Sequence, residues 1–227
     1  VGVISPWNFP VNLILMPLAG IFAAGNRAMI KPSELTPATS SIIDKMFKDF
    51  FDEAEAVVYV GNSEVGAAFS SLPFDHLIFT GGTEIAKHVM RAASDNLVPL
   101  TLELGGKSPV IISKSANISK TANRVMIGKT MNAGQICLAP DYALIPKEKI
   151  NDFVRESKTA ISNMYPHIKE NEDYTSIINE KHYDRIQDYL EDAKSKGADV
   201  VEINPKNEDF TQQQYFKIPP TLVLNPT

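Results

Sequence analysis

Short apolar segments alternate with stretches of helical periodicity along the first hundred residues of the chain. The strand-like segments are bounded by Gly, Pro or Ser, and they cover residues 1–5, 28–31, 57–60, 76–80 and 99–104. Between two of them, Thr36-Pro37 has the form of a helix N-cap followed by proline at the first helical position. Strands that alternate with helices predict an α/β fold built on a doubly wound parallel sheet.

Two of the intervening segments show a clear one-sided apolar spacing. The first places Ile42, Ile43, Met46, Phe47 and Phe50 on one face of a helix. The second begins after Thr83 and has the same helical period. Both are predicted to be amphipathic helices that lie against the sheet.

A longer apolar run extends over residues 11–25 and requires a separate interpretation. It is too short to span a bilayer comfortably, and Pro17 lies inside it. Gly25-Asn26 closes the run in the manner of a helix C-terminal cap. We therefore predict a buried helix.

The pattern is less regular in the second half of the chain. Strands are predicted at 109–112, 142–145, 198–202 and 221–224, helices at 118–131, 147–164 and 180–196, and an exposed polar loop at 204–214. Gly105-Gly106 is the predicted domain boundary, which divides the chain into residues 1–104 and 105–227. The second part is expected to be a portion of another α/β domain.

Composition limits the classes of function that remain open. The 227 residues are 44% hydrophobic and 22% charged, as in an ordinary globular protein, and carry a formal net charge of −5. That charge argues against a nucleic-acid partner, and no strong membrane signal is visible. A single cysteine excludes an intrachain disulfide framework and favours a cytoplasmic location. The four histidines are not at metal-ligand spacing, so no metal is expected.

The single cysteine, Cys137, ends the segment Asn-Ala-Gly-Gln-Ile-Cys. Glu103 lies in Leu-Glu-Leu, at the end of an apolar strand that is followed by Gly-Gly. Covalent chemistry at a thiol requires a nucleophile, a group that polarises the carbonyl, and a base that releases the acyl group. A carboxylate at the position of Glu103 should be partly desolvated, which suits a general base.

Four segments, taken in their order and spacing, resemble the aldehyde dehydrogenase superfamily over essentially the whole chain. They are Ser-Pro-Trp-Asn-Phe-Pro at 5–10, Lys-Pro-Ser-Glu at 31–34, Phe-Thr-Gly-Gly-Thr at 79–83, and the stretch from Glu103 to Cys137. The resemblance implies a nicotinamide-dependent oxidation of an aldehyde through a thiohemiacetal and a thioester.

The resemblance assigns the three catalytic roles. Cys137 would be the nucleophile, and Asn8 would donate to the oxyanion together with the backbone N–H of Cys137. Glu103 would activate the water that hydrolyses the thioester. Without the resemblance, the sequence favours a small buried thiol and a turn asparagine, and it permits a glutamate on the polar face of an edge strand.

The resemblance also implies a cofactor site. Lys31 and Glu34 are similar to the pair that contacts the adenosine ribose, and a carboxylate there favours NAD, with NADP also possible. The segment could otherwise be a solvated loop with a proline turn. Trp7 is assigned to the cofactor site as well; it lies beside Asn8, where it could also pack near the substrate channel or equally be a core tryptophan.

No Gly-x-Gly-x-x-Gly fingerprint is present. Instead, a predicted strand ends at Thr80-Gly81-Gly82 and a helix opens next to it, so that the N-terminus of the helix could receive the pyrophosphate. Many members of the superfamily carry Ser at the position of Gly82. We therefore expect a shifted cofactor pose.

Residues 12–18 and 134–142 look closest to the fatty and aromatic aldehyde branch of the superfamily, an appearance shared by bacterial coniferyl aldehyde dehydrogenases. The substrate would then be a hydrophobic aldehyde such as coniferyl aldehyde. Superfamily members are more than twice as long, so the chain is expected to be an internal fragment of a homodimeric or homotetrameric enzyme. The alternatives are a CoA-acylating relative, which Glu103 disfavours, and a noncatalytic protein that retains the fold.

Overall fold

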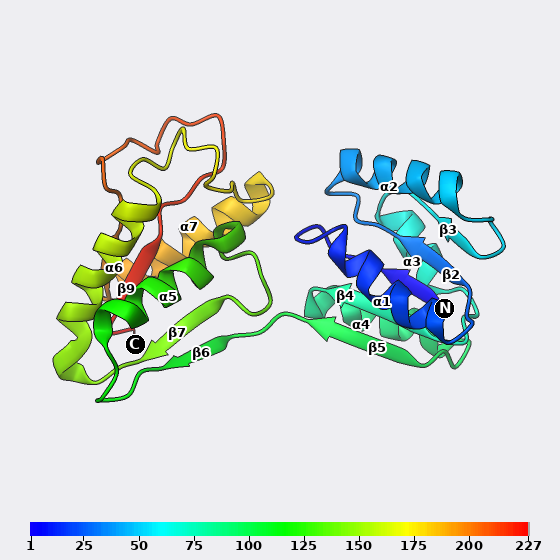
Figure 1. Ribbon diagram of the computed structural model, residues 1–227, viewed down its shortest axis with the longest axis horizontal. Helices are drawn as coiled ribbons and strands as arrows, with labels where there is room; N and C mark the ends of the chain where they lie inside the picture. The colour runs from blue at the N-terminus through cyan, green and yellow to red at the C-terminus, as the bar shows by residue number, and fades with distance from the viewer. Residues whose placement is uncertain (227) are drawn as a thin grey trace. The chain divides into compact units, whose positions relative to one another are not determined.

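The computed structural model describes residues 1–226 and forms two compact units, which are Val1–Gly105 and a second unit that begins at Gly106 (Figure 1). Each unit has its own hydrophobic core. The two are described separately below.

The first unit is built on a five-stranded parallel sheet. Its strands are β1 (Gly2–Ile4), β2 (Ala28–Lys31), β3 (Ala56–Val58), β4 (Leu77–Gly81) and β5 (Leu100–Leu104). Their order is β3-β2-β1-β4-β5, and every pair is parallel. The predicted α/β fold with a doubly wound parallel sheet is confirmed, because the chain runs outward from β1 to β3 and then returns to the other side of β1.

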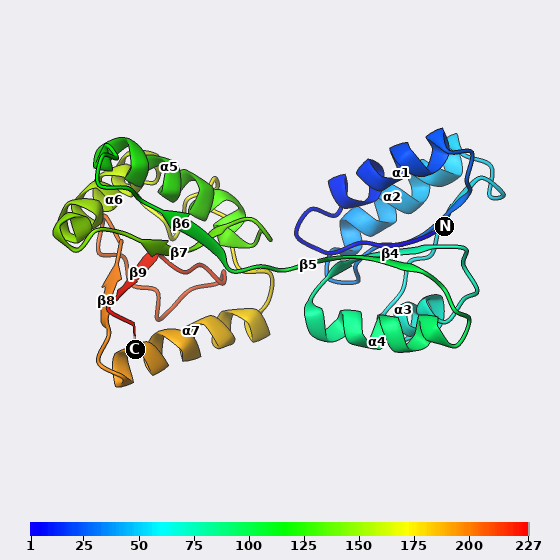
Figure 2. The same cartoon turned by 90° about the horizontal axis from the view of Figure 1, so that it is seen from below.

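Helices cover both faces of this sheet. Helices α1 (Asn12–Ala23) and α2 (Pro37–Phe50) lie on one face, and α3 (Ser63–Ser70) and α4 (Thr83–Ser94) lie on the other (Figure 2). The change of face occurs where the chain leaves β3 for β4. The topological switch point of the sheet therefore lies between β1 and β4.

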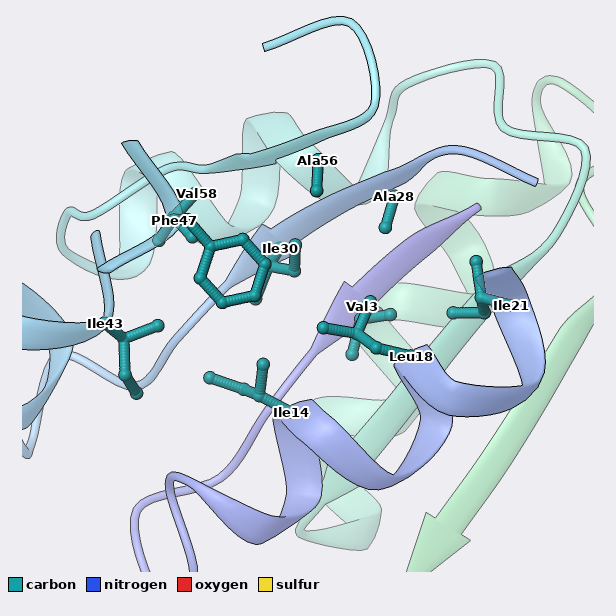
Figure 3. Packing of buried hydrophobic residues seen from close by; sticks show 10 residues of the cluster. All are labelled: Val3, Ile14, Leu18, Ile21, Ala28, Ile30, Ile43, Phe47, Ala56 and Val58. Atoms are coloured by element: carbon teal, nitrogen blue, oxygen red, sulfur yellow. The ribbon is translucent and has the colours of Figure 1, made fainter. Parts of the chain in front are cut away.

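The core on the α1–α2 face is made of aliphatic side chains around one phenylalanine (Figure 3). Phe47 of α2 is 1% exposed and packs with Ile30 of β2, while Ile14 of α1 belongs to the same cluster. Burial of a side chain of this kind contributes about 1.5–3 kcal/mol. The amphipathic spacing predicted for 42–50 thus identified the buried face of α2, although Ile42 and Phe50 themselves are exposed.

The prediction that 11–25 is a buried helix is wrong in one respect. Helix α1 buries only Ile14, Leu18 and Ile21, whereas Leu15 and Met16 are exposed. A helix that lies on one face of a sheet has one covered side, whatever its overall hydrophobicity. The uniform apolar composition of the run concealed this asymmetry.

Helix α1 ends in a Schellman motif. The N–H of Gly25 donates to the carbonyl of Phe22 at 2.9 Å, and the N–H of Asn26 donates to the carbonyl of Ile21 at 3.0 Å. Gly25 has a φ of 74°, a conformation that glycine adopts without steric cost. The predicted cap at Gly25-Asn26 agrees with this geometry.

Helix α4 ends in the same motif, but with leucine in the left-handed position. The N–H of Leu97 donates to Ser94 and that of Val98 to Ala93, both at 3.1 Å. Leu97 has a φ of 54° and is 90% exposed. A residue with a Cβ atom in this conformation costs about 1–2 kcal/mol.

The sequence pattern does not predict α3, whereas the predicted N-cap of α2 at Thr36 is confirmed. Helix α3 has only eight residues, too few to establish a helical period, and Asn62 caps it by accepting from the N–H groups of Glu64 and Val65. Thr36 does occupy the N-cap position of α2, yet its side chain makes no capping bond there. Its hydroxyl instead donates to the carbonyl of Ser33 at 3.5 Å.

The second unit contains two small sheets and three α-helices within its described residues. The strands are β6 (Ser108–Ile111) and β7 (Pro140–Leu144), which are parallel, and β8 (Asp199–Glu202) and β9 (Thr221–Leu224), which are antiparallel. The helices are α5 (Ile118–Thr130), α6 (Ile150–Met164) and α7 (Glu180–Ser195), with short 3-10 turns at Met131–Gly134 and Lys147–Lys149. No helix or strand falls within 204–214, as predicted.

The core of the second unit lies between α5 and α6. Met126 of α5 and Phe153 and Ile161 of α6 belong to one buried cluster. Ser157 of α6 is fully buried beside this cluster, and its hydroxyl has no hydrogen-bond partner in the structure. Ile112 and Ile203, which lie outside the two helices, belong to the same cluster, so the helices pack against the strands as well as each other.

Candidate active site

In the first unit, the candidate residues gather at the carboxyl edge of the sheet. Because β1, β2, β4 and β5 are parallel, their last residues Ile4, Lys31, Gly81 and Leu104 lie along one edge. The register pairs Ile4 with both Lys31 and Phe79, so β1 and β2 end level with each other and β4 continues two residues further to Gly81. This edge, at the switch point, is where ligands bind in open α/β sheets.

Trp7 and Asn8 follow β1 directly at this edge. Both side chains are half-buried. The Oδ1 atom of Asn8 accepts from the N–H of Phe9 at 3.1 Å. This bond engages the oxygen of the amide and orients the side chain.

Lys31 is the last residue of β2, and its buried side chain bonds to the residues that follow it. Its side chain is 3% exposed, and Nζ donates to the carbonyl of Pro32 at 2.7 Å and to Oε2 of Glu34 at 3.4 Å. The side chain of Glu34 is 45% exposed. A solvated loop is thus the wrong description for Lys31, because a buried ammonium group requires such partners.

The segment Thr80-Gly81-Gly82 joins β4 to α4. Gly82 is the N-cap of α4 and contributes no side-chain capping bond, and a Cβ atom built on it would meet open space. A Cβ atom on Gly81 would lie 2.6 Å from the ring of Phe79. The first backbone N–H groups of α4 therefore face an uncrowded backbone turn, an arrangement that suits an anion.

Glu103 lies on β5, the edge strand, and is paired in register with Thr80 of β4. The predicted partial burial of its carboxylate is wrong, because Glu103 is exposed. The alternation along β5 turns Thr101 and Glu103 to the open side of the strand, while Leu102 and Leu104 face the core. The carboxylate is therefore accessible to water.

Cys137 belongs to the second unit, where it follows α5 and a tight turn. Asn132, Ala133 and Gly134 are all left-handed, with φ values of 49°, 51° and 76°. For Ala133 this conformation costs about 1–2 kcal/mol, whereas asparagine adopts it more readily. Cys137 itself is half-buried and is a free thiol. The turn thus carries backbone strain just before the candidate nucleophile.

Gly134 is the residue in this turn at which an added side chain would be crowded and strained. A Cβ atom there would lie 3.1 Å from the carbonyl oxygen of Lys129 and 3.3 Å from its Cε atom. Burial lowers the pKa of Lys129, and nearby Asp141 partly opposes that shift. Asp141 also forms an ion pair with Lys107 at 2.9 Å.

The backbone of Cys137 lies beside the beginning of β6. The hydroxyl of Ser108 donates to the carbonyl of Cys137 at 3.5 Å, and a Cβ atom on Gly106 would lie 3.4 Å from the same oxygen. Gly106 and Ser108 thus flank the loop that carries the thiol.

The structure brings together the candidate residues that share a unit. Asn8, Lys31, Glu34, Thr80–Gly82 and Glu103 lie along one sheet edge of the first unit, while Cys137 lies in the second. Gln135 received no role in the sequence analysis, although its side chain hydrogen-bonds Ser176 and Ile178. Nothing in the sequence indicates a pairing over this separation, since only the folded chain brings the two segments together.

Two features are absent from residues 1–226. No helix in this part of the chain has the length and hydrophobicity needed to cross a membrane. No group of three His, Cys, Asp or Glu side chains in the same range is arranged to hold a metal ion.

The fold places the first unit among doubly wound α/β proteins whose switch point presents a helix N-terminus, a feature that binds phosphate groups in that class. Comparison with known families narrows this class. The model of the aldehyde dehydrogenase family matches residues 1–227. The chain belongs to the aldehyde dehydrogenase family, and the resemblance noted in the sequence is confirmed.

Two bacterial relatives match nearly the whole chain. A probable coniferyl aldehyde dehydrogenase of Caulobacter vibrioides is 63% identical over 227 residues, and a coniferyl aldehyde dehydrogenase of a Pseudomonas species is 60% identical over 225 residues. The matches cover 100% and 99% of the chain but 47% of each relative. The chain thus spans about half the length of the curated relatives it matches.

A solved structure supports the same fold. Aldehyde dehydrogenase C of Pseudomonas syringae, a mutant crystallised with NAD⁺ and octanal, is 25% identical with a TM-score of 0.87. The superposition covers 98% of this chain and 47% of that one.

Proposed function

We propose that the protein containing this chain oxidises a hydrophobic aldehyde to its carboxylic acid with NAD⁺ or NADP⁺. The observation that carries the proposal is Cys137, the single thiol of the chain, which follows a strained left-handed turn. The identity of 63% to a probable coniferyl aldehyde dehydrogenase supports the same reaction. We further propose residues 1–104 as the NAD-binding domain and 105–227 as the catalytic domain.

Cys137 is the proposed nucleophile. Its thiolate attacks the aldehyde carbon and forms a thiohemiacetal, in which the former carbonyl oxygen carries the developing negative charge. The amide of Asn8 and the backbone N–H of Cys137 are the proposed donors to that oxygen. A single donor of this kind is worth about a hundredfold in rate or more.

Glu103 is the proposed base for the second half of the reaction. After oxidation, the acyl group is bound to Cys137 as a thioester, and a water molecule must attack it. Glu103 is exposed, so water can reach its carboxylate. A positioned carboxylate that accepts the proton from water accelerates such a step by about a hundredfold or more.

NAD⁺ is the proposed cofactor, and the chemistry it supplies is to accept the hydride. The residues at the sheet edge fit it: the N-terminus of α4 at Gly82 suits the pyrophosphate, and Lys31 and Glu34 suit the adenosine ribose. The exposed carboxylate of Glu34 would accept bonds from ribose hydroxyl groups and disfavour a 2′-phosphate. Trp7, Thr80 and Gly81 border the same edge.

Coniferyl aldehyde is the proposed substrate, with other aromatic or aliphatic aldehydes as substrates of the same class. The support is the identity to the two coniferyl aldehyde dehydrogenases, and the octanal bound to the Pseudomonas syringae protein illustrates the aliphatic alternative. We also propose that the full-length protein is a homodimer or homotetramer and that it lies in the cytoplasm. Size-exclusion chromatography of the full-length protein tests the oligomeric state.

The deciding experiment is an assay of NADH formation by the full-length protein with coniferyl aldehyde, repeated with hexanal. Turnover without CoA establishes hydrolysis to the free acid. Turnover that requires added CoA instead identifies an acylating enzyme. A protein that binds NAD⁺ but turns over under neither condition is noncatalytic.

A further inference from the structure

The side chain of Gln135 links two segments that are far apart in the sequence. Its Nε2 donates to the carbonyl of Ser176 at 3.0 Å, and its Oε1 accepts from the N–H of Ile178 at 3.0 Å. The amide therefore pairs with one edge of the segment as a neighbouring strand would. The same Nε2 also donates to the carbonyl of Asn132 at 3.0 Å.

These bonds act on the strained turn that precedes Cys137. Asn132, Ala133 and Gly134 are left-handed, and the backbone N–H of Gln135 donates to the carbonyl of Asn132 at 3.0 Å. A strained conformation persists only where its surroundings over-determine it. Gln135 closes the turn through both its backbone and its side chain, two residues before the thiol.

The partner segment is itself held in place. Residues 165–179, which we call the anchor loop, contain no helix or strand. The carboxylate of Glu208 accepts from the N–H groups of Ile168 at 2.6 Å and of Lys169 at 3.1 Å. Bonds between backbone N–H groups and a carboxylate are among the stronger hydrogen bonds in proteins.

Two further contacts fix the anchor loop. The buried ammonium group of Lys217 donates to the carbonyl of Asn171 at 2.5 Å, and the N–H of Ile177 donates to the carbonyl of Phe216 at 2.8 Å. The segment to which Gln135 binds is thus tied to residues 208–217 by side chains and backbone together. It can serve as a fixed support for the turn.

We propose that Gln135 is a positioning residue that fixes the orientation of Cys137 by tying the strained turn to the anchor loop. The inference rests on the proposed function in so far as Cys137 is the nucleophile. Gln135 acts through the backbone and takes no part in the chemical steps. Small displacements of a reacting group can cost about a hundredfold in rate, so loss of this support should be visible in turnover.

The test uses the full-length protein with Gln135→Met, which keeps the length of the side chain and removes its hydrogen bonds to Asn132, Ser176 and Ile178. We expect kcat to fall about tenfold or more, while the Kd for NAD⁺ and the KM for aldehyde change less than about threefold. The alkylation rate of Cys137 by iodoacetamide, followed by mass spectrometry of its peptide, should change about threefold or more. Ile161→Val, in the core of the second unit, is the matched control for a loss of stability alone.

Gln135→Glu adds a readout that a purely structural role would not produce. One carboxylate oxygen can still accept from Ile178, but the other then faces the carbonyl oxygens of Asn132 and Ser176. Protonation restores a donor at that position. Partial burial beside two carbonyl oxygens raises the pKa of the introduced carboxyl group above its ordinary value of about 4.3, so the activity of this variant relative to the wild type should rise as the pH falls from about 7 towards about 5.

The outcomes separate the two proposals. Alkylation requires neither cofactor nor aldehyde, so a changed alkylation rate in Gln135→Met supports positioning even if the full-length protein has no dehydrogenase activity. If Gln135→Met lowers the thermal midpoint as Ile161→Val does but leaves kcat and alkylation unchanged, the positioning role is refuted. A flat pH dependence of the relative activity of Gln135→Glu also counts against it.

Discussion

The carboxyl edge of the sheet in the first unit and the loop at residues 131–137 in the second unit, here called the cysteine loop, are assembled by different means. The edge is set by strand topology, since the parallel strands β1, β2, β4 and β5 end within two residues of one another and bring Asn8, Lys31, Thr80 and Glu103 to the same edge. The cysteine loop has no such template. It depends on left-handed backbone and on side chains that bridge distant segments.

This difference has a consequence for substitution. At the sheet edge, many side chains can change without moving the backbone, because the ladder hydrogen bonds and the two covering helix layers hold it. In the cysteine loop, the single side chain of Gln135 hydrogen-bonds Asn132, Ser176 and Ile178, so its loss alters the backbone directly. The following predictions test this contrast, from the largest expected effect to the smallest.

Cys137→Ala in the full-length protein is expected to lower dehydrogenase turnover by about a thousandfold or more, because the covalent intermediate can no longer form. NAD⁺ binding, proposed for the other unit, should keep its Kd within about threefold. Turnover is measured as NADH formation and the Kd by calorimetry. Retained turnover would refute the assignment of the nucleophile.

Glu103→Gln is expected to slow hydrolysis of the acyl-enzyme by about a hundredfold and hydride transfer much less, since only hydrolysis needs a base at this point. A burst of NADH followed by slow turnover should appear in rapid mixing, with the thioester detectable by mass spectrometry. The backbone at this position is fixed by pairing with Thr80, so the thermal midpoint should not move. A uniform loss of both phases would contradict the assigned role.

Tyr174→Phe tests the anchor loop through its pH dependence. The hydroxyl of Tyr174 donates to the carbonyl of Ile218 at 2.8 Å, and its loss should cost about 1 kcal/mol of unfolding free energy at neutral pH. Burial, with a smaller contribution from Tyr165, raises the pKa of Tyr174 above the ordinary value of about 10.

The sign of the pH effect follows from that raised pKa. The neutral phenol is favoured in the folded state, so its contribution is fully present below about pH 10 and is lost as the pH rises further. The difference in urea midpoint between the wild type and Tyr174→Phe should therefore shrink above about pH 10. If the difference in urea midpoint stays constant above about pH 10, ionisation of the Tyr174 hydroxyl group does not control the stability of the anchor loop.

The smallest effect is expected at a helix end in the first unit. Leu97→Gly should stabilise the protein by about 0.5–1 kcal/mol, because it relieves a left-handed leucine whose exposed side chain contributes little packing, less the entropy that glycine loses on folding. Gly25→Ala, at the equivalent position of α1, is the control and should destabilise by a similar amount. Urea unfolding measures both, and equal signs for the two substitutions would be inconsistent with this explanation.

Much of the first unit could be predicted from the sequence, because its information is local. Periodicity and Gly or Pro boundaries located the five strands and three of the helices, and a parallel sheet then fixes which ends come together. The exposure of Glu103 could not be predicted in this way. The segment Leu-Glu-Leu allows the glutamate to lie on either face of a strand. Its exposure follows only from the place of β5 as an outermost strand of the sheet.

The cysteine loop was less accessible to sequence reasoning. The motif identified Cys137, but the left-handed conformation of Ala133 has no local signal, since alanine rarely adopts it. The pairing of Gln135 with Ser176 and Ile178 depends on how the chain folds between them. Helix α3 could not be predicted for another reason, because its eight residues are too few to establish a helical period.

The anchor loop has one further consequence, which concerns amide hydrogen exchange. Loops without helix or strand normally exchange their amide protons rapidly. Here the N–H groups of Ile168, Lys169, Ile177 and Ile178 are all bonded to side chains or backbone elsewhere in the unit. These protons should exchange on the slow timescale of the neighbouring helices, so that residues 165–179 open only when the second unit itself opens.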